Sequence, residues 1–215
     1  FGYVFRKEWV KPYESLLGML WKFTQMNRLP GHSVVTQLCS RPTDPYEGIA
    51  ITDVDVKRVA RLLGIAQFKV RAGIGKSAKD ASPFFRHCTS CMALGYHCRL
   101  YQYERHFYCP IHRLPLRAEC CRCGRPSAYW LDAQLLDAPF RCRHCGAYYS
   151  HLYGTTPKLW SNTLATAKKR TALSRITHGR SMPVADTGAP ICLYAQERKV
   201  GTQHSRSAGS VKAFE

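Results

Sequence analysis

The sequence predicts a mixed α protein with a small β content: an N-terminal helical region, two tandem cysteine-rich modules and a C-terminal basic helix. Three observations predict this order. Apolar residues recur at helical spacing before residue 83, eight of the eleven cysteines fall into short groups between residues 88 and 145, and a basic amphipathic pattern covers residues 159–177. With 45% hydrophobic and 21% charged residues, the 215-residue chain has the composition of a globular protein.

The predicted organisation has four parts: residues 1–83, 84–150, 151–178 and 179–215. In the last part glycine, serine and proline become frequent and apolar periodicity is lost, so we expect a flexible tail. No apolar run approaches the roughly 18–20 residues that a membrane span needs. Because no secretion signal pattern is visible either, we expect a cytoplasmic protein without a membrane partner.

The N-terminal part contains two predicted helices. Residues 12–27 place leucine and aromatic residues, Trp21 among them, every three or four positions, which is typical of a helix with one buried face. A second helix is expected over residues 53–63, with Gly64 as its C-terminal cap. Trp9 and Trp21 also give this region a face on which a partner protein could dock.

Ligand pairs at two-residue spacing dominate the second part. They are, in order, Cys88-Thr-Ser-Cys91, Cys109-Pro-Ile-His112, Cys120-Cys-Arg-Cys123 and Cys142-Arg-His-Cys145. Two ligands spaced in this way occupy one tight turn and point to one ion, and a second turn completes a tetrahedron. The spacings suit zinc better than iron–sulfur clusters. We therefore predict two structural zinc ions, one bound by Cys₃His and one by Cys₄, in tandem zinc-ribbon or knuckle modules.

Two alternatives concern these cysteines. A disulfide framework would need an oxidising compartment, for which the sequence gives no signal, and the cysteine total is odd. Cys121 could replace Cys120 as a ligand, although only Cys120 keeps the two-residue spacing to Cys123. Four protein ligands leave no metal-bound water to activate, and the His-x-Glu pair of zinc deaminases does not occur in the sequence. We therefore expect no enzyme activity.

The net charge of +18 indicates a polyanionic partner, most often a nucleic acid, and we expect DNA. Residues 1–83, 84–150 and 151–215 carry +6, +5 and +7, so the charge is not confined to the tail. The predicted phosphate contacts lie beside the second ligand set and on the late helix: Arg122, Arg125, Arg141, Arg143, Lys168, Lys169, Arg170 and Arg175. The alternative is that these side chains form ordinary solvated faces.

Several motifs occur in a specific order along residues 9–150. Pro12-Tyr-Glu-Ser opens the series, and Cys88-Thr-Ser-Cys91, Gly95-Tyr-His97, Cys109-Pro-Ile-His112-Arg-Leu-Pro-Leu116 and Cys120-Cys-Arg-Cys123-Gly follow. This order resembles the TniQ family, whose members select target sites for transposons. The resemblance implies the same eight zinc ligands and an adaptor without chemistry of its own.

The resemblance also implies partners. Family members recognise target DNA, or dock on an RNA-guided CRISPR effector complex with its guide RNA, and recruit the transposition AAA+ ATPase. The alternative is a free-standing zinc-ribbon regulator that binds DNA without a transposition partner. A stretch rich in aromatic residues, with Tyr96, Tyr101, Tyr103, Phe107 and Tyr108, is a candidate protein-docking surface. The target sequence, and whether the chain acts as a monomer or a homodimer, stay open.

Overall fold

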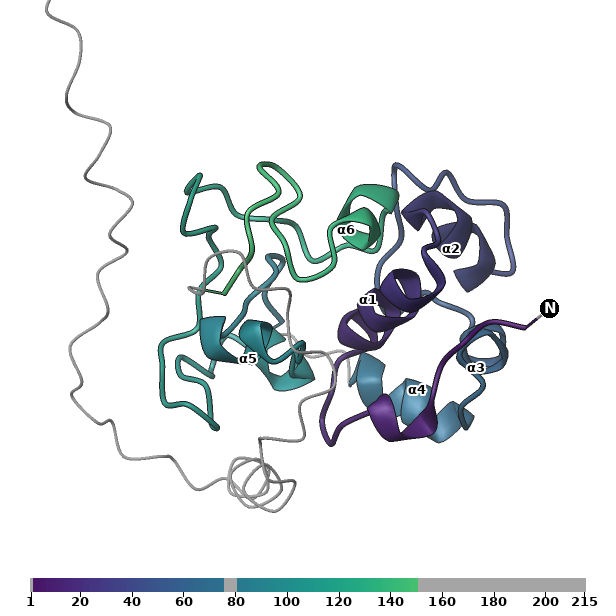
Figure 1. Cartoon of the computed structure of the whole chain (residues 1–215), viewed down its shortest axis with the longest axis horizontal. Helices are drawn as coiled ribbons and strands as arrows, with labels where there is room; N and C mark the ends of the chain where they lie inside the picture. Colours follow the sequence, from purple (N-terminus) through teal and green to yellow (C-terminus); the bar gives the residue numbers. More distant parts are fainter. Residues whose placement is uncertain (1, 76–80, 151–215) are drawn as a thin grey trace, which may run out of the picture.

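A computed structural model describes residues 2–75 and 81–150, which form a mixed helical fold with little strand (Figure 1). The elements are η1 Lys7–Trp9, α1 Leu16–Asn27, α2 Gly31–Leu38, α3 Val56–Leu63, α4 Gln67–Ile74, α5 Thr89–Ala93, η2 Arg99–Gln102 and α6 Ala133–Asp137. The predicted basic helix and tail lie outside the described residues. Within the described ranges, no helix combines the length and apolar character needed to cross a membrane.

Helix α1 confirms the first predicted helix but begins four residues later. Tyr13 has a left-handed backbone (φ 59°), so the helix cannot include it, and the Ser15 side chain instead caps the first turn by accepting a hydrogen bond from the Gly18 N–H at 3.0 Å. The residues from Leu16 to Thr24 are all buried. Helix α1 is therefore the centre of the core, and Trp21, with no exposed surface, cannot be part of the predicted docking face.

Helix α3 confirms the second predicted helix, with Asp55 as its N-terminal cap and Gly64 in the left-handed conformation at its C-terminal end. Helices α2 and α4 were not predicted. Both are eight residues long and follow directly after a turn, so their apolar periodicity covers only about two turns of helix.

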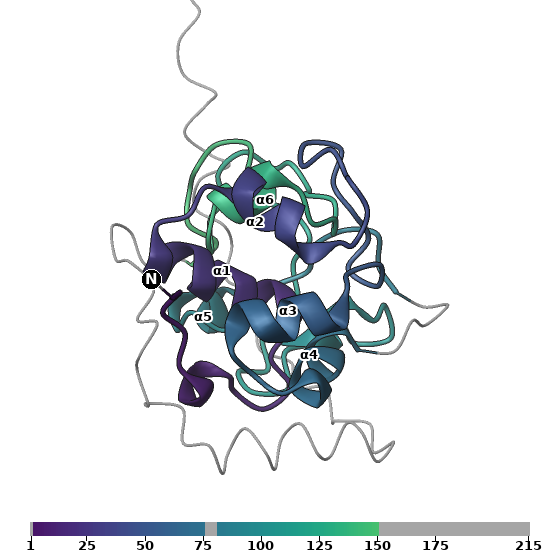
Figure 2. The same cartoon turned by 90° about the vertical axis from the view of Figure 1, so that its right-hand side faces the viewer.

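One hydrophobic core joins both sides of the predicted boundary at residue 83. Helix α6 packs on α2 and lies close to α1, and the Trp21 indole N–H donates to the Leu135 carbonyl at 2.7 Å (Figures 1 and 2). Leu131, Leu136 and Phe140 belong to the same buried cluster as the leucines of α1. The helical region thus provides a rigid base for the cysteine-rich segment.

The β content of the described residues consists of isolated antiparallel bridges between loops. Three of these bridges, Tyr108 with Pro115, Glu119 with Pro126 and Arg141 with Tyr148, each close a hairpin around one cysteine turn. The cysteine-rich segment therefore has few backbone hydrogen bonds of regular structure, and its side chains must provide the cross-links.

Candidate metal centres

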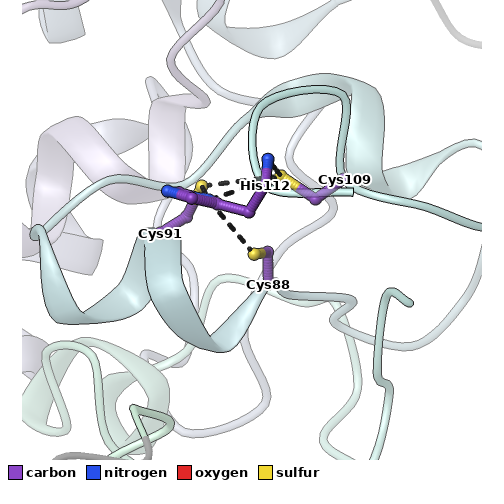
Figure 3. A group of neighbouring side chains, drawn as sticks. All are labelled: Cys88, Cys91, Cys109 and His112. Atoms are coloured by element: carbon purple, nitrogen blue, oxygen red, sulfur yellow. Dashed lines mark hydrogen bonds between the residues drawn. The ribbon is translucent and has the colours of Figure 1, made fainter. Parts of the chain in front are cut away.

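The first ligand set comes together at the start of α5. Cys88 is the residue before this helix and Cys91 lies within it, while Cys109 and His112 belong to a facing turn (Figure 3). Their ligand atoms all lie within 4.8 Å of one another, and the three cysteines are buried. The sequence-predicted Cys₃His set is thus assembled as expected.

The distances in this set match a tetrahedral zinc site. With zinc–sulfur bonds of about 2.3 Å and zinc–nitrogen bonds of about 2.0 Å, a tetrahedron places two sulfurs ~3.8 Å apart and a sulfur and a nitrogen ~3.5 Å apart. The Sγ atoms of Cys91 and Cys109 are 3.8 Å apart, and the His112 Nδ1 lies 3.5, 3.3 and 3.7 Å from the Sγ atoms of Cys88, Cys91 and Cys109. The donors present therefore fit zinc.

The second set has the same dimensions. The Sγ atoms of Cys120 and Cys145 are 3.7 Å apart, as are those of Cys123 and Cys142, and all four ligand atoms lie within 4.8 Å of one another. Cys121 lies outside this cluster, where its sulfur accepts a hydrogen bond from Arg117 at 3.5 Å. Of the two adjacent cysteines, Cys120 is the candidate ligand.

Three of the four pairs lie in the same kind of turn. After Cys109, Cys120 and Cys142, the residue four positions on has a left-handed backbone and donates its N–H to the carbonyl of that cysteine at 2.8 Å; these residues are Arg113, Gly124 and Gly146. A further backbone N–H in each turn points to the sulfur at 3.4 Å. Such N–H groups stabilise thiolate charge, so each turn is built for a metal-bound sulfur.

Burial opposes the charged form of the ligand thiols, although hydrogen bonds from neighbouring groups outweigh it at Cys109 and Cys123 and lower the pKa of both. Burial raises the pKa of Cys91, and its neighbours Cys109 and Cys88 raise it further; burial also raises the pKa of Cys120. Several buried thiolates at contact distance become stable once a divalent cation neutralises them. None of the ten cysteines in the described part of the chain forms a disulfide.

Tyr101 contacts two sulfurs of the first set, a role that no sequence pattern indicated. Its hydroxyl lies 2.9 Å from the Cys91 sulfur and 3.1 Å from the Cys109 sulfur. Tyr96, Tyr101 and Tyr103 are buried, so the predicted aromatic docking surface is wrong for these three residues. Phe107 and Tyr108 are exposed and remain candidates.

Two other possible ligand residues, His97 and Cys98, lie close to the first set along the chain but do not belong to it. Burial raises the pKa of Cys98 to about 12, as expected for a neutral, packed thiol. The His97 ring has no exposed surface; its Nδ1 lies 2.6 Å from the Ser15 hydroxyl and its Nε2 lies 2.9 Å from the Arg86 carbonyl. Because the carbonyl can only accept, Nε2 carries the proton and Nδ1 accepts from Ser15. His97 thereby ties the start of α1 to the metal-binding segment.

The four described arginines that were predicted to contact phosphates lie around the second set, and they differ in exposure and in partners. Arg122 and Arg125 are exposed. Arg141 lies over the Tyr148 ring, 5.9 Å from its centroid. Arg143 forms an ion pair with Asp132 at 2.7 Å, which reduces the charge it can offer to DNA. Lys168, Lys169, Arg170 and Arg175 lie outside the described residues.

Comparisons with known proteins give no match: neither a protein-family model nor a curated protein sequence is significantly similar to this chain. The resemblance to the TniQ family therefore stays a prediction from its motifs. The structure adds that two of these motifs meet in space, since Ser15 contacts His97 and the Tyr96 hydroxyl donates to the Pro12 carbonyl at 2.8 Å.

Proposed function

We propose that the chain is a zinc-containing, DNA-associated adaptor for transposon target-site selection. In this role it links target DNA, or an RNA-guided effector, to the transposition AAA+ ATPase in the cytoplasm. The observation that carries the proposal is the pair of four-ligand clusters within the motif order that resembles the TniQ family. Four protein ligands around each zinc would leave no open position, so the metals would stabilise the fold and activate no water.

The positive charge supports the DNA association. The described part of residues 84–150 presents Arg122 and Arg125 on the surface beside the second ligand set, and neither has an acidic partner within it. Exposed guanidinium groups at a rigid site can each neutralise a phosphate. The DNA would thus bind to a surface that the neighbouring zinc cluster holds in place.

Exposed aromatic residues support the protein association. Phe107 is 69% exposed and Tyr108 is 44% exposed, next to the ligand Cys109. Large apolar rings at a surface are enriched in protein interfaces because they bury much area on binding. We propose this pair as a contact for the ATPase.

Co-purification with an AAA+ ATPase encoded beside this chain, with and without DNA, tests the proposal. We expect retention by the wild type, a strong loss with Phe107→Ala and Tyr108→Ala together, and unchanged zinc content. Tyr46→Ala is the matched control, because Tyr46 is 64% exposed in a loop far along the chain from the metal ligands. DNA binding without ATPase retention would favour the free-standing regulator instead, and unaided cleavage or joining of DNA would overturn the adaptor.

A further inference from the structure

Two large apolar side chains, Phe84 and Trp130, share an exposed face of the molecule. Phe84 and Ala128 are opposite each other in an antiparallel bridge. Because side chains alternate along an extended strand, Trp130 points to the same side as Ala128 and therefore as Phe84. Phe84 is 45% exposed and Trp130 is 43% exposed, whereas the following residues, Phe85 and Leu131, are buried. We call the surface formed by Phe84, Ala128 and Trp130 the aromatic patch.

The backbone around Trp130 is held in place before anything binds. Ile49 and Leu131 exchange two backbone hydrogen bonds, both at 2.9 Å. A Cβ atom at Gly48 would lie 2.6 Å from the Trp130 Cδ1, so one edge of the indole already packs on the backbone of the preceding turn. A rigid ring loses little conformational freedom when an occupant covers it, and its exposed area contributes nothing to folding as it stands.

An acidic turn adjoins the aromatic patch. Asp44 and Glu47 are exposed in the turn that ends at Gly48, where the Gly48 N–H donates to the Asp44 carbonyl at 3.1 Å. Neither carboxylate forms an ion pair within residues 2–75 and 81–150. An occupant that combines apolar side chains with basic ones at their margin would therefore complement both the aromatic patch and the acidic turn.

The described chain ends next to this surface. The Tyr149 hydroxyl lies 3.0 Å from the Ser127 hydroxyl, and its ring centroid lies 5.2 Å from that of Phe85. Ser127 and Phe85 are the sequence neighbours of Ala128 and Phe84. The nine residues 151–159 can span up to ~30 Å at about 3.3 Å each. The part of the chain that follows is therefore within reach of the aromatic patch.

The sequence of residues 159–177 has the matching pattern. Trp160, Leu164 and Ala167 are spaced by four and three positions, which places them in one stripe of the expected helix. Lys168 and Arg170 fall on either side of this stripe in a helical projection. An apolar stripe with basic margins is the complement of an aromatic patch beside an acidic turn.

From these observations we propose that residues 159–177 bind the aromatic patch of their own chain, with Trp160 and Leu164 against Phe84 and Trp130. The basic side chains at the margin of the stripe then meet the acidic turn. The contact holds the basic segment on the folded part of the molecule. This inference goes beyond the proposed function, because it requires neither DNA nor an ATPase.

Hydrogen exchange of the full, zinc-loaded chain, followed by mass spectrometry, tests the proposal. We expect protected amides within residues 159–177 of the wild type. Phe84→Ala and Trp130→Ala together should accelerate their exchange about 10- to 100-fold, since buried aromatic anchors carry much of such a contact. Phe68→Ala is the matched control: this ring is 66% exposed on α4, outside the aromatic patch, and its removal should leave the exchange unchanged.

A variant in the segment itself keeps the test decisive if the patch variant disturbs the fold. Trp160→Ala leaves residues 2–150 intact and should accelerate exchange in residues 159–177 by a similar factor. Unprotected amides in the wild type, or protection that neither Trp160→Ala nor the patch variant reduces, would overturn the proposal. Protection that falls on dilution of the protein would show that a second copy covers the aromatic patch, which also overturns it.

Discussion

Lys22 lies on the buried side of α1, where its ammonium group is paired with Glu14 at 2.5 Å and donates to the Trp9 carbonyl at 2.9 Å. Both side chains are essentially unexposed. Removal of one partner would leave the other charge buried without compensation. We expect Glu14→Gln to lower the free energy of unfolding by about 3–5 kcal/mol, measured by urea denaturation.

The double variant Glu14→Gln, Lys22→Met serves as the control for this pair, because it removes both charges and keeps the volume of each side chain. We expect it to recover most of the lost stability. Equal losses in the single and the double variant would show that packing, and not charge pairing, determines the role of Glu14.

His97 predicts a dependence of stability on pH. Burial lowers its pKa from 6.5 to about 4, although the hydrogen bond to the Arg86 carbonyl acts in the opposite direction. The folded state therefore favours the neutral ring, and the unfolded state takes up a proton first as the pH falls. The contribution of the neutral His97 ring to the free energy of unfolding is complete above pH 6.5. It is lost as the pH falls towards 4, by roughly 1.4 kcal/mol per pH unit. NMR titration checks this directly: an imidazole that titrates near 6.5 in the folded, zinc-loaded protein would contradict it.

At the residue level the sequence predicted the candidate metal ligands, but it did not predict the residues that contact them or that tie the metal-binding segment to α1. Only two residues separate the members of a ligand pair such as Cys88 and Cys91, so the spacing alone predicts that both lie in one tight turn. The contact between Ser15 and His97 joins residues 82 positions apart, and no local pattern encodes it. Tyr101 lies only ten and eight positions from the two cysteines whose sulfurs it contacts, but no spacing rule links a tyrosine to metal-ligand pairs, so this contact was missed too.

Among the helices, the close approach of α2 and α6 depends on Gly31. Its N–H donates to the Asp137 carboxylate at 2.6 Å, and a Cβ atom here would lie 2.2 Å from the Ala133 carbonyl oxygen. We expect Gly31→Ala to push the two helices apart and to cost about 1–3 kcal/mol of unfolding free energy.

Ser33→Ala, two residues along the same helix, is the control, and we expect a change within about 0.5 kcal/mol. Calorimetry on the zinc-loaded protein measures both variants. A Gly31→Ala protein as stable as Ser33→Ala would mean that α2 and α6 do not meet in this way.

Helix length and capping explain which helices the sequence could predict. Helices α1 and α3 have a cap and a clear apolar face, so their residues determine them locally. Helices α5 and α6 have five residues each, too short for a periodic signal, and form where the metal-binding turns and the core place them. The expected β content is limited to isolated bridges in the described ranges, because the short hairpins are held by their cysteine turns.

For the whole molecule, the net charge of +18 predicts DNA binding that depends strongly on salt. Each neutralised phosphate releases counterions, so four contacts reduce affinity about 10²-fold between 50 and 200 mM salt. Fluorescence anisotropy with a labelled duplex measures the slope. We expect Arg122→Glu with Arg125→Glu to make the slope shallower, and an affinity that ignores salt would show that the charge serves another purpose.

Metal binding also links the two halves of the molecule. Cys120 and Cys142 belong to the same buried cluster as the leucines of α1, so loss of the second metal would open the core as well as the cysteine turns. We expect a chelator to abolish hydrogen-exchange protection in the four cysteine turns first and then to weaken that of α6 and α2. Unchanged protection after complete chelation would show that the cysteine-rich segment folds without metal.

The central claim is that each chain holds two structural zinc ions, and the most direct test is the zinc stoichiometry of the purified protein. Native mass spectrometry should show two zinc ions per chain, with one ion lost in Cys88→Ser, one lost in Cys142→Ser and none lost in Cys98→Ser. A wild-type stoichiometry near zero, or disulfides among the eight ligand residues in place of thiolates, would contradict the account.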